Sequence, residues 1–346
     1  FRKGELPMGE VWNYTPLQCA ETRKRLNRET ELENPRRTAI LLTCSRAFAF
    51  CTYVSVASLF KNSPQLAQES DVLVFLWNAP SGMKQIFASI SPQVHVLDFD
   101  MPYPVPDRKA ISMFTPASYA RFECFRLLDR YERVLFLDAD ILVRKELDIF
   151  PQVKHGIAMT LDPVMTTVER NFFSVPEGVN PKTTGYNAGV FALTRDLPCP
   201  GSYAKLTDWL YEKMAEWADF VFLPDQAVIN VAVEHFGWQV TTLSKDYNRP
   251  ASSSRADLKR AFIVHSTGTR KFWCYYYFRD WYQLYAEWIA KGGEPVSIRK
   301  DSPAYISFCR KHGLQDRVFF QLMPDCFAHP TKALRFALKA WLKAEF

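Results

Sequence analysis

The sequence predicts an α/β fold in which a mainly parallel mixed sheet is flanked by helices. Short apolar runs rich in Val, Ile and Leu alternate along the chain with segments whose apolar residues recur at helical spacing. Strands and helices that alternate in this way form sheets covered on both faces. The chain shows no internal repeat and no long Pro- or Ser-rich linker, so we expect one main domain.

Each predicted element rests on its own local pattern. Apolar runs of strand length predict strands over residues 38–44, 71–77, 94–99, 133–138, 156–161, 188–193, 238–243 and 261–265. Helical spacing of the apolar residues predicts helices over residues 50–61, 83–90, 116–131, 203–217, 224–236 and 278–291. Two of these helices begin at Pro116 and Pro224, in agreement with the preference of proline for the first helical turn.

The main domain is expected to span residues 37–292 between two extensions. Residues 1–36 are polar and interrupted by prolines, and predict an N-terminal extension. Residues 293–346 form a basic C-terminal extension, because nine Lys or Arg between residues 299 and 346 face four acids and supply +5 of the formal charge of +6. A basic tail on a nearly neutral body favours an anionic surface as partner, and argues against nucleic acid.

The last residues, 332–346, carry their cations and their apolar side chains on different sides of a predicted helix. This pattern is typical of a helix that lies in an anionic membrane interface, and a terminal helix packed on the domain is the alternative. The sequence contains no run of 18 apolar residues. We therefore expect peripheral membrane association, either at a cytosolic face or in the Golgi lumen after removal of an anchor before Phe1.

Several functional classes are disfavoured by missing motifs. The eight cysteines include no Cys-x-x-Cys pair, so neither a zinc ribbon nor a dense disulfide framework is expected. No Gly-x-Gly-x-x-Gly follows a predicted strand, which argues against a nicotinamide-dependent dehydrogenase. A haloacid dehalogenase-type phosphatase would carry Thr or Val where this chain has Leu142.

The strongest candidate for a functional site is the apolar run that ends in Asp138-Ala139-Asp140. Residues i and i+2 of a strand share a face, so both carboxylates can converge on one cation at the carboxyl end of a sheet strand. Hard oxygen ligands suit Mn²⁺ or Mg²⁺, and such an ion is often bound by carboxylates of the protein and by phosphates of the substrate at the same time. A second run ends in Asp98-Phe99-Asp100, and only the downstream motifs distinguish the two.

Three downstream motifs carry further polar chemistry. His265 ends a predicted strand and is followed by Gly268 and Lys271, which could supply a metal ligand, close backbone approach and a cation for a phosphate. The segment 186–191 places Asn187 and a glycine at the start of another strand. Asp225 and Gln226 lie in the first turn of a predicted helix, where an acidic residue is also common for purely structural reasons.

Together and in this order, these motifs resemble glycosyltransferase family 8 from about residue 38 to residue 273. The markers are residues 117–121 ahead of the metal strand, Asp138-Ala139-Asp140, Tyr186-Asn187-Ala188-Gly189, Asp225-Gln226, and His265-x-x-Gly268-x-x-Lys271-x-Trp273. The resemblance implies a GT-A fold, which is a Rossmann-like sheet that binds a nucleotide-diphospho-sugar. Phe272 stands where the family usually has proline, and Thr43-Cys44-Ser45 where many members carry an acidic residue for the uracil.

The resemblance also implies the activity and the roles of the residues. The expected reaction moves galactose, glucose or N-acetylglucosamine from a UDP-sugar to a glycan, glycolipid or glycoprotein with retention of configuration. Asp138, Asp140 and His265 are expected to hold Mn²⁺, with Mg²⁺ as the alternative, and Gln226 and Asp225 are the expected catalytic residues. The expected donor-binding residues are Thr43, Ser45, Arg121, Asp138, Ala139, Asp140, Asp162, Asn187, Ala188, Gly268 and Lys271. The alternative outside enzymology is a catalytically degenerate carbohydrate-binding or scaffold subunit.

Overall fold

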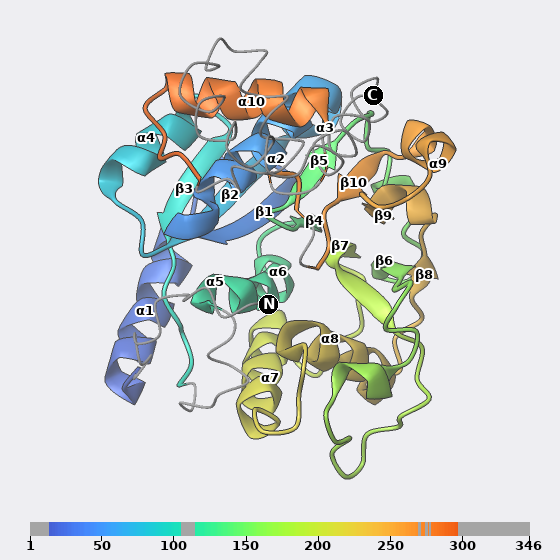
Figure 1. The fold of residues 1–346 in the computed structure, drawn as a ribbon. Coiled ribbons are helices and arrows are strands. Elements are labelled where there is room, and N and C mark those ends of the chain that lie inside the picture. Colours follow the sequence, from blue (N-terminus) through green and yellow to red (C-terminus); the bar gives the residue numbers. More distant parts are fainter. Residues whose placement is uncertain (1–13, 105–114, 269–270, 274–275, 277, 297–346) are drawn as a thin grey trace, which may run out of the picture.

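A seven-stranded mixed sheet forms the centre of the molecule (Figure 1). The computed structural model describes residues 14–104, 115–268, 271–273, 276 and 278–296. Along the sheet the strands follow the order β3 (Val94–Asp98), β2 (Ser70–Trp77), β1 (Thr38–Ser45), β4 (Arg133–Leu137), β7 (Tyr186–Thr194), β6 (Ile157–Leu161) and β8 (Thr241–Thr242). A second sheet has the order β5 (Ile141–Val143), β10 (Ile263–His265) and β9 (Arg249–Pro250). The predicted α/β architecture with a mainly parallel sheet is confirmed.

Strand β7 is the one reversed strand in the large sheet. It pairs antiparallel with both β4 and β6, whereas the other neighbouring pairs are parallel. The connection from β6 to β7 contains a short 3₁₀ turn at Val168–Asn171 but no crossover helix, so the chain returns beside β6 in the opposite direction. The reversal brings the start of β7, rather than its end, to the edge of the sheet where β4 and β6 end.

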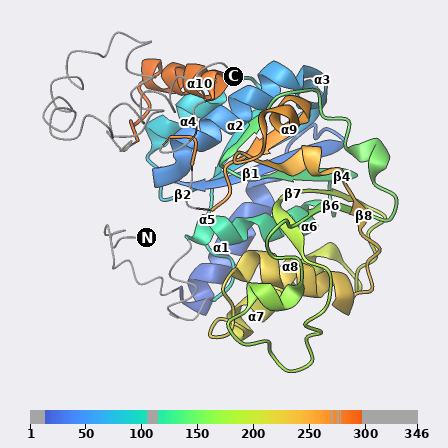
Figure 2. The ribbon, with the colours of Figure 1, turned by 45° about the vertical axis from the view of Figure 1, so that its right-hand side comes forward.

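Helices cover both faces of the large sheet (Figures 1 and 2). One face carries α2 (Ala49–Asn62), α3 (Pro64–Gln68), α4 (Ser81–Ala88) and α10 (Arg279–Ala290). The other carries α1 (Pro16–Glu29), α5 (Pro116–Tyr119), α6 (Glu123–Leu127), α7 (Tyr203–Glu216) and α8 (Pro224–His235), while α9 (Arg255–Arg260) lies near the small sheet. Two separate apolar cores result, one on each face of the sheet. In the described part of the chain no helix is long and apolar enough to cross a membrane.

Three details of the predicted elements are wrong. The helix expected over residues 116–131 is broken, because α5 and α6 are separated by a 3₁₀ turn at Ala120–Phe122 in which the Arg121 side chain donates from Nε to the Ser118 carbonyl at 3.0 Å. The strand expected over residues 238–243 shrinks to β8. The elements α1, α3, α9, β5 and β9 were not predicted, because α1 is too polar for a clear apolar period and the other four are brief. The predicted helix at residues 332–346 lies outside the described residues.

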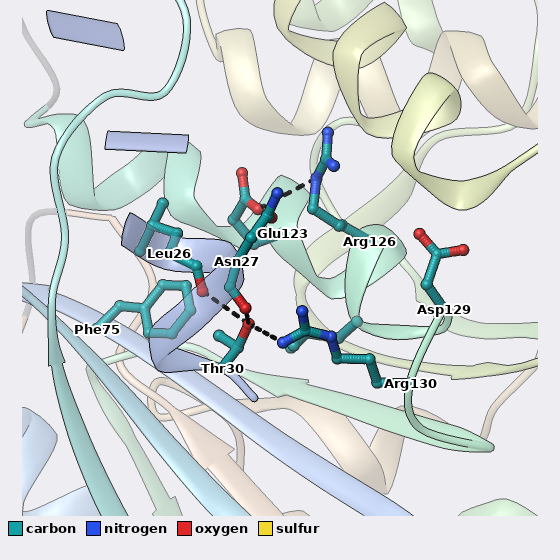
Figure 3. A pocket seen from close by; sticks show the side chains of 9 residues that line it. Leu26, Asn27, Thr30, Phe75, Glu123, Arg126, Asp129 and Arg130 are labelled. Atoms are coloured by element: carbon teal, nitrogen blue, oxygen red, sulfur yellow. Dashed lines mark hydrogen bonds and ion pairs between the residues drawn. The ribbon is translucent and has the colours of Figure 1, made fainter. Parts of the chain in front are cut away.

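The first described helix, α1, is attached to the domain by polar contacts. Thr15 and Gln18 form a capping box at its start. Arg23 pairs with Glu123 of α6 at 2.6 Å, and Arg130 donates to Thr30 at 2.7 Å. A small pocket remains between α1 and the α6 segment (Figure 3), lined by two acids and two arginines among other residues. The pocket shares no residue with the candidate site described below.

Buried hydroxyls of α2 hold the segment that follows β4. The Ser55 Oγ lies 2.8 Å from the Ala139 carbonyl oxygen and 2.9 Å from that of Ile141. Ser58 accepts a hydrogen bond from the Val143 amide at 3.0 Å. Asn62 donates to the Val143 carbonyl at 2.8 Å. These bonds satisfy backbone groups that no neighbouring strand reaches, and they fix the turn that carries Asp138 and Asp140.

We expect Ser55→Ala to lower the free energy of unfolding by about 1–3 kcal/mol, because it leaves buried carbonyl groups without their donor. Chemical denaturation of the purified protein measures this change. Ser89→Ala is the matched control: its hydroxyl bonds the Ile86 carbonyl at an exposed helix end, so a change within about 0.5 kcal/mol is expected. Equal decreases in the free energy of unfolding of the two variants would show that the contacts of Ser55 do not stabilise the protein more than an exposed hydroxyl does.

Candidate active site

The two carboxylates after β4 converge with a histidine from the small sheet. One ligand atom each from Asp138, Asp140 and His265 lie within 4.8 Å of one another. His265 reaches this position because β10 pairs antiparallel with β5, with His265 opposite Ile141. The Ser266 amide also donates to the Asp140 carbonyl at 3.0 Å. The structure therefore brings together the three residues that the sequence analysis selected as metal ligands.

The donor chemistry of this cluster fits a divalent cation. Carboxylates and imidazoles are both common ligands of divalent metal ions. This is the only cluster of three His, Cys, Asp or Glu ligand atoms found in the described part of the chain. The Asp140 and His265 side chains are 8% and 5% exposed, whereas that of Asp138 is 24% exposed. A cation held here would thus keep one side open to a substrate.

The second Asp-x-Asp forms no comparable site. Asp98 pairs with Lys84 at 2.5 Å, and Asp100 accepts a hydrogen bond from the Tyr14 hydroxyl at 2.9 Å. The two carboxylates are thus each engaged with a partner of their own. This difference makes Asp98 a suitable internal control for Asp140.

Asp140 is a buried anion surrounded by cationic or hydrogen-bonding groups. Burial alone would raise the pKa of this carboxyl, but Lys271 and His265 beside it hold the pKa well below its usual range. Lys271 forms an ion pair with Asp140 and donates to the Ser266 carbonyl at 2.9 Å. Burial opposes the charge on Lys271 as well, yet Asp140 raises its pKa. Both groups therefore stay ionised at neutral pH.

Arg121 links the carboxylate cluster to the start of α8. Its Nη2 lies 2.9 Å from an oxygen of Asp225 and 3.6 Å from one of Asp138. Its Nη1 donates to the Ala188 carbonyl at 3.0 Å, and the guanidinium lies over the Phe136 ring. Burial raises the pKa of Asp225, with a further contribution from Asp138, while Arg121 acts in the opposite direction.

Gln226 and Asp162 form the other end of the site. Gln226 donates from Nε2 to Asp162 Oδ2 at 3.2 Å and to Asn171 Oδ1 at 3.0 Å, while its Oε1 accepts from the Ala188 amide at 3.2 Å. Asp162 Oδ2 also accepts from Asn187 at 2.9 Å, and its Oδ1 accepts from the Val164 and Met165 amides at 2.8 and 2.7 Å. These four bonds use the four principal acceptor positions of the carboxylate.

A hydrogen-bond connection runs from Asn187 to His265 through Asn248. Asn248 donates from Nδ2 to Asn187 Oδ1 at 2.7 Å, and its own Oδ1 lies 2.8 Å from His265 Nδ1. Neither Asn248 nor Asn171 was predicted from the sequence. Asn248 and Asn171 are each the last residue of a 3₁₀ turn, and neither lies within a recognisable motif.

The remaining predicted donor-binding residues lie around this edge of the sheet. β1 and β4 pair in parallel with Leu41 opposite Phe136, and continuing that register places Thr43 level with Asp138. Thr43 and Ser45 are both buried. Ala139 lies between the two carboxylates. Gly268 follows Ser266 with a φ of +70°, a backbone conformation that favours glycine.

Comparison with known proteins identifies one family by sequence and several solved structures with a similar fold. The family model described as glycosyl transferase family 8 matches residues 39–276. No curated protein sequence matches the chain.

Two solved structures similar to this one are glycosyltransferases of low sequence identity. A structure of the bifunctional glycosyltransferase WbbM in its apo form has a TM-score of 0.54 at 16% identity, covering 74% of this chain and 50% of WbbM. This chain thus matches half the length of WbbM. A structure of the galactosyltransferase LgtC with donor and acceptor sugar analogues has a TM-score of 0.52 at 17% identity, covering 73% of this chain and 99% of LgtC. These likenesses concern the fold.

We expect Gly189→Ala to disrupt the cluster of Asp138, Asp140 and His265 by displacing the imidazole. A Cβ at this position in β7 would lie 2.4 Å from Cε1 and 2.9 Å from Nδ1 of His265, so the imidazole must move. The expected result is an affinity for Mn²⁺ about 10–100-fold weaker, measured by titration of the purified protein with the metal alone. Gly82→Ala is the matched control, since its Cβ would meet no atom within 4 Å. Unchanged Mn²⁺ affinity in Gly189→Ala would contradict the geometry described above.

Proposed function

The chain belongs to glycosyl transferase family 8, and on that premise we propose that this glycosyltransferase moves a hexose from a UDP-sugar with retention of configuration. The proposed sugar is galactose, glucose or N-acetylglucosamine. The observation that carries the proposal is the meeting of Asp138, Asp140 and His265 at the edge of the sheet, with Lys271 and Arg121 beside them. Such an arrangement suits a diphosphate bound through a divalent cation.

The charges of the site support a cation and a diphosphate together. Three carboxylates, Asp138, Asp140 and Asp225, face two permanent cations, Arg121 and Lys271. Carboxylates outnumber cations here, so a divalent cation offsets the excess negative charge and makes the site more attractive to the anionic donor. We therefore propose that Mn²⁺, or Mg²⁺ in its place, binds before or together with the UDP-sugar.

In the proposed reaction the protein side chains stabilise the departing diphosphate and orient the sugar. A bound Mn²⁺ would act as a Lewis acid toward the diphosphate as the glycosidic bond breaks. Lys271 and Arg121 offset the negative charge that develops on the leaving group, in a site where burial strengthens each interaction. Ala139, Gly268, Thr43 and Ser45 are proposed to contact the nucleotide part of the donor.

Gln226 is proposed to face the anomeric carbon with its amide oxygen. An amide is a poor nucleophile, so we favour stabilisation of an oxocarbenium-like state during front-face attack over a lasting covalent adduct. The Ala188 amide and the Asp162 and Asn171 side chains already fix the orientation of this amide group. Asp225 is proposed to bind a sugar hydroxyl, with Arg121 holding its carboxylate in place.

The proposed acceptor is a glycan, a glycolipid or a glycoprotein. The loop over residues 162–185 begins at Asp162 and carries an exposed aromatic residue, Phe173, whose ring meets that of Phe222 edge to face at 5.6 Å. Phe222 lies only three residues before Asp225, so this pair is within reach of a sugar next to the reacting one. The basic segment 332–346 is proposed to hold the enzyme at an anionic membrane surface, on the cytosolic or the Golgi-luminal side.

A degenerate binding subunit is the alternative, and donor hydrolysis distinguishes the two. We expect slow, Mn²⁺-dependent release of UDP from at least one UDP-hexose without added acceptor, because water can replace the acceptor hydroxyl. Mass spectrometry of the sugar product across a panel of UDP-sugars identifies the donor. Tight donor binding without turnover of any member of the panel would favour the binding subunit.

Asp140→Asn should lower the Mn²⁺-dependent turnover of the UDP-sugar by about 10²–10³-fold, which corresponds to ~3–4 kcal/mol of transition-state stabilisation. Steady-state measurement of UDP release tests this expectation. Asp98→Asn is the matched control from the second Asp-x-Asp, and its turnover should remain within about twofold. A similar loss in both variants would contradict the assignment of the metal site to Asp138 and Asp140.

Both Gln226→Ala and Asp140→Ala should lower turnover, and the kcat of Gln226→Ala should remain at least tenfold higher than that of Asp140→Ala. The reason is that the Gln226 oxygen contributes one oriented dipole, whereas Asp140 contributes a full charge to the proposed metal site. The comparison uses kcat values at saturating donor and Mn²⁺. Complete loss of activity in both variants would instead support a covalent role for Gln226.

A further inference from the structure

We propose that Asn248 is a positioning residue that keeps the proton of neutral His265 on Nδ1 and thereby presents the Nε2 lone pair to a divalent cation. The inference rests on the metal site of the proposed function, but not on the identity of the donor or acceptor. It is carried by a chain of hydrogen bonds from Asp162 through Asn187 and Asn248 to His265.

Asp162 fixes which group donates and which accepts in this series of hydrogen bonds. An ionised carboxylate only accepts hydrogen bonds, so Asn187 must turn its Nδ2 toward Asp162, at 2.9 Å. Its Oδ1 then points the other way, where it also accepts from the Gly189 backbone amide at 2.9 Å. A carboxylate on one side and a backbone donor on the other leave only one orientation of the Asn187 amide.

Asn248 passes this direction on to the histidine. Its Nδ2 must face Asn187 Oδ1, at 2.7 Å, and it lies 3.3 Å from the Thr160 hydroxyl. Its Oδ1 therefore faces His265 Nδ1 at 2.8 Å as an acceptor, and this nitrogen must carry a proton. In the neutral ring the lone pair then lies on Nε2, which is the nitrogen 3.1 Å from Asp140 and 3.8 Å from Asp138.

Burial stabilises these hydrogen bonds between Asp162 and His265. Asp162, Asn248 and His265 are 7%, 7% and 4% exposed and Asn187 is half-buried, so water has little access to the bonds on either side of Asn248. A histidine ligand generally depends on such a partner to fix its tautomer and ring orientation. Asp162, which was expected to bind the donor, thus has a second role as the anchor of the hydrogen bonds that orient His265.

The test compares three variants by their affinity for Mn²⁺ alone, without nucleotide. Asn248→Leu removes the acceptor for Nδ1–H, and we expect binding about 10–100-fold weaker. Asn248→Asp keeps the acceptor for Nδ1–H but replaces the Nδ2 donor to Asn187 with an oxygen, and we expect Mn²⁺ binding weaker than in the unaltered protein and tighter than in Asn248→Leu. Thr160→Val removes the other partner of Asn248 while preserving volume, and should leave Mn²⁺ affinity unchanged. Thermal unfolding confirms that each variant is folded.

A second measurement needs no variant. Long-range ¹H–¹⁵N correlation spectra of the protein saturated with diamagnetic Mg²⁺ report which ring nitrogen of His265 carries the proton, and we expect Nδ1. Observation of the Nε2–H tautomer, or unchanged Mn²⁺ affinity in folded Asn248→Leu, would overturn the proposal. An inactive protein that still shows the Nδ1–H tautomer and the expected order of Mn²⁺ affinities would instead refute the proposed reaction and leave this inference intact.

Discussion

The buried charge of Asp140 is the constraint on which the rest of the site depends. A carboxylate that is 8% exposed is costly unless ionised partners or hydrogen bonds compensate for its lost hydration. Here the compensation comes from chain segments far apart in sequence, since Lys271 and His265 lie more than a hundred residues beyond Asp140. Folding of the small sheet, β5-β10-β9, is therefore coupled to completion of the charge cluster, because β10 delivers His265 beside β5.

The same turn is held from behind by a helix that is almost entirely buried. Ser55, Ser58 and Asn62 of α2 bond to backbone atoms of residues 139–143, where a regular sheet would offer a neighbouring strand. Side-chain hydroxyls and an amide thus replace part of a strand ladder. Because these bonds come from α2 on one side, the opposite side of the turn is free for the carboxylates. The groups that hold the backbone in place are therefore separate from those that contact Asp138 and Asp140.

The sequence predicted those parts of the molecule that depend on local patterns. Apolar period identified the major strands and most of the long helices, and strand-end chemistry selected Asp138, Asp140 and His265. It could not predict the 3₁₀ turn at Ala120–Phe122, because the side-chain bond of Arg121 to the Ser118 carbonyl that accompanies this turn leaves no apolar pattern. Asn248 was missed for a similar reason: its importance arises from bonds across 17 and 61 residues, which leave no local signature.

The reversal of β7 has a consequence for how this fold can diversify. The loop over residues 162–185 leaves β6 and enters β7 at the same edge, and the Asp162 amide closes its base on the Gly185 carbonyl at 3.0 Å. For a loop with a closed base, doubling the length costs only about 0.6 kcal/mol of closure entropy. Outside the 3₁₀ turn Val168–Asn171, which bonds Gln226, insertions and deletions can therefore reshape what borders the site while the strands keep their register.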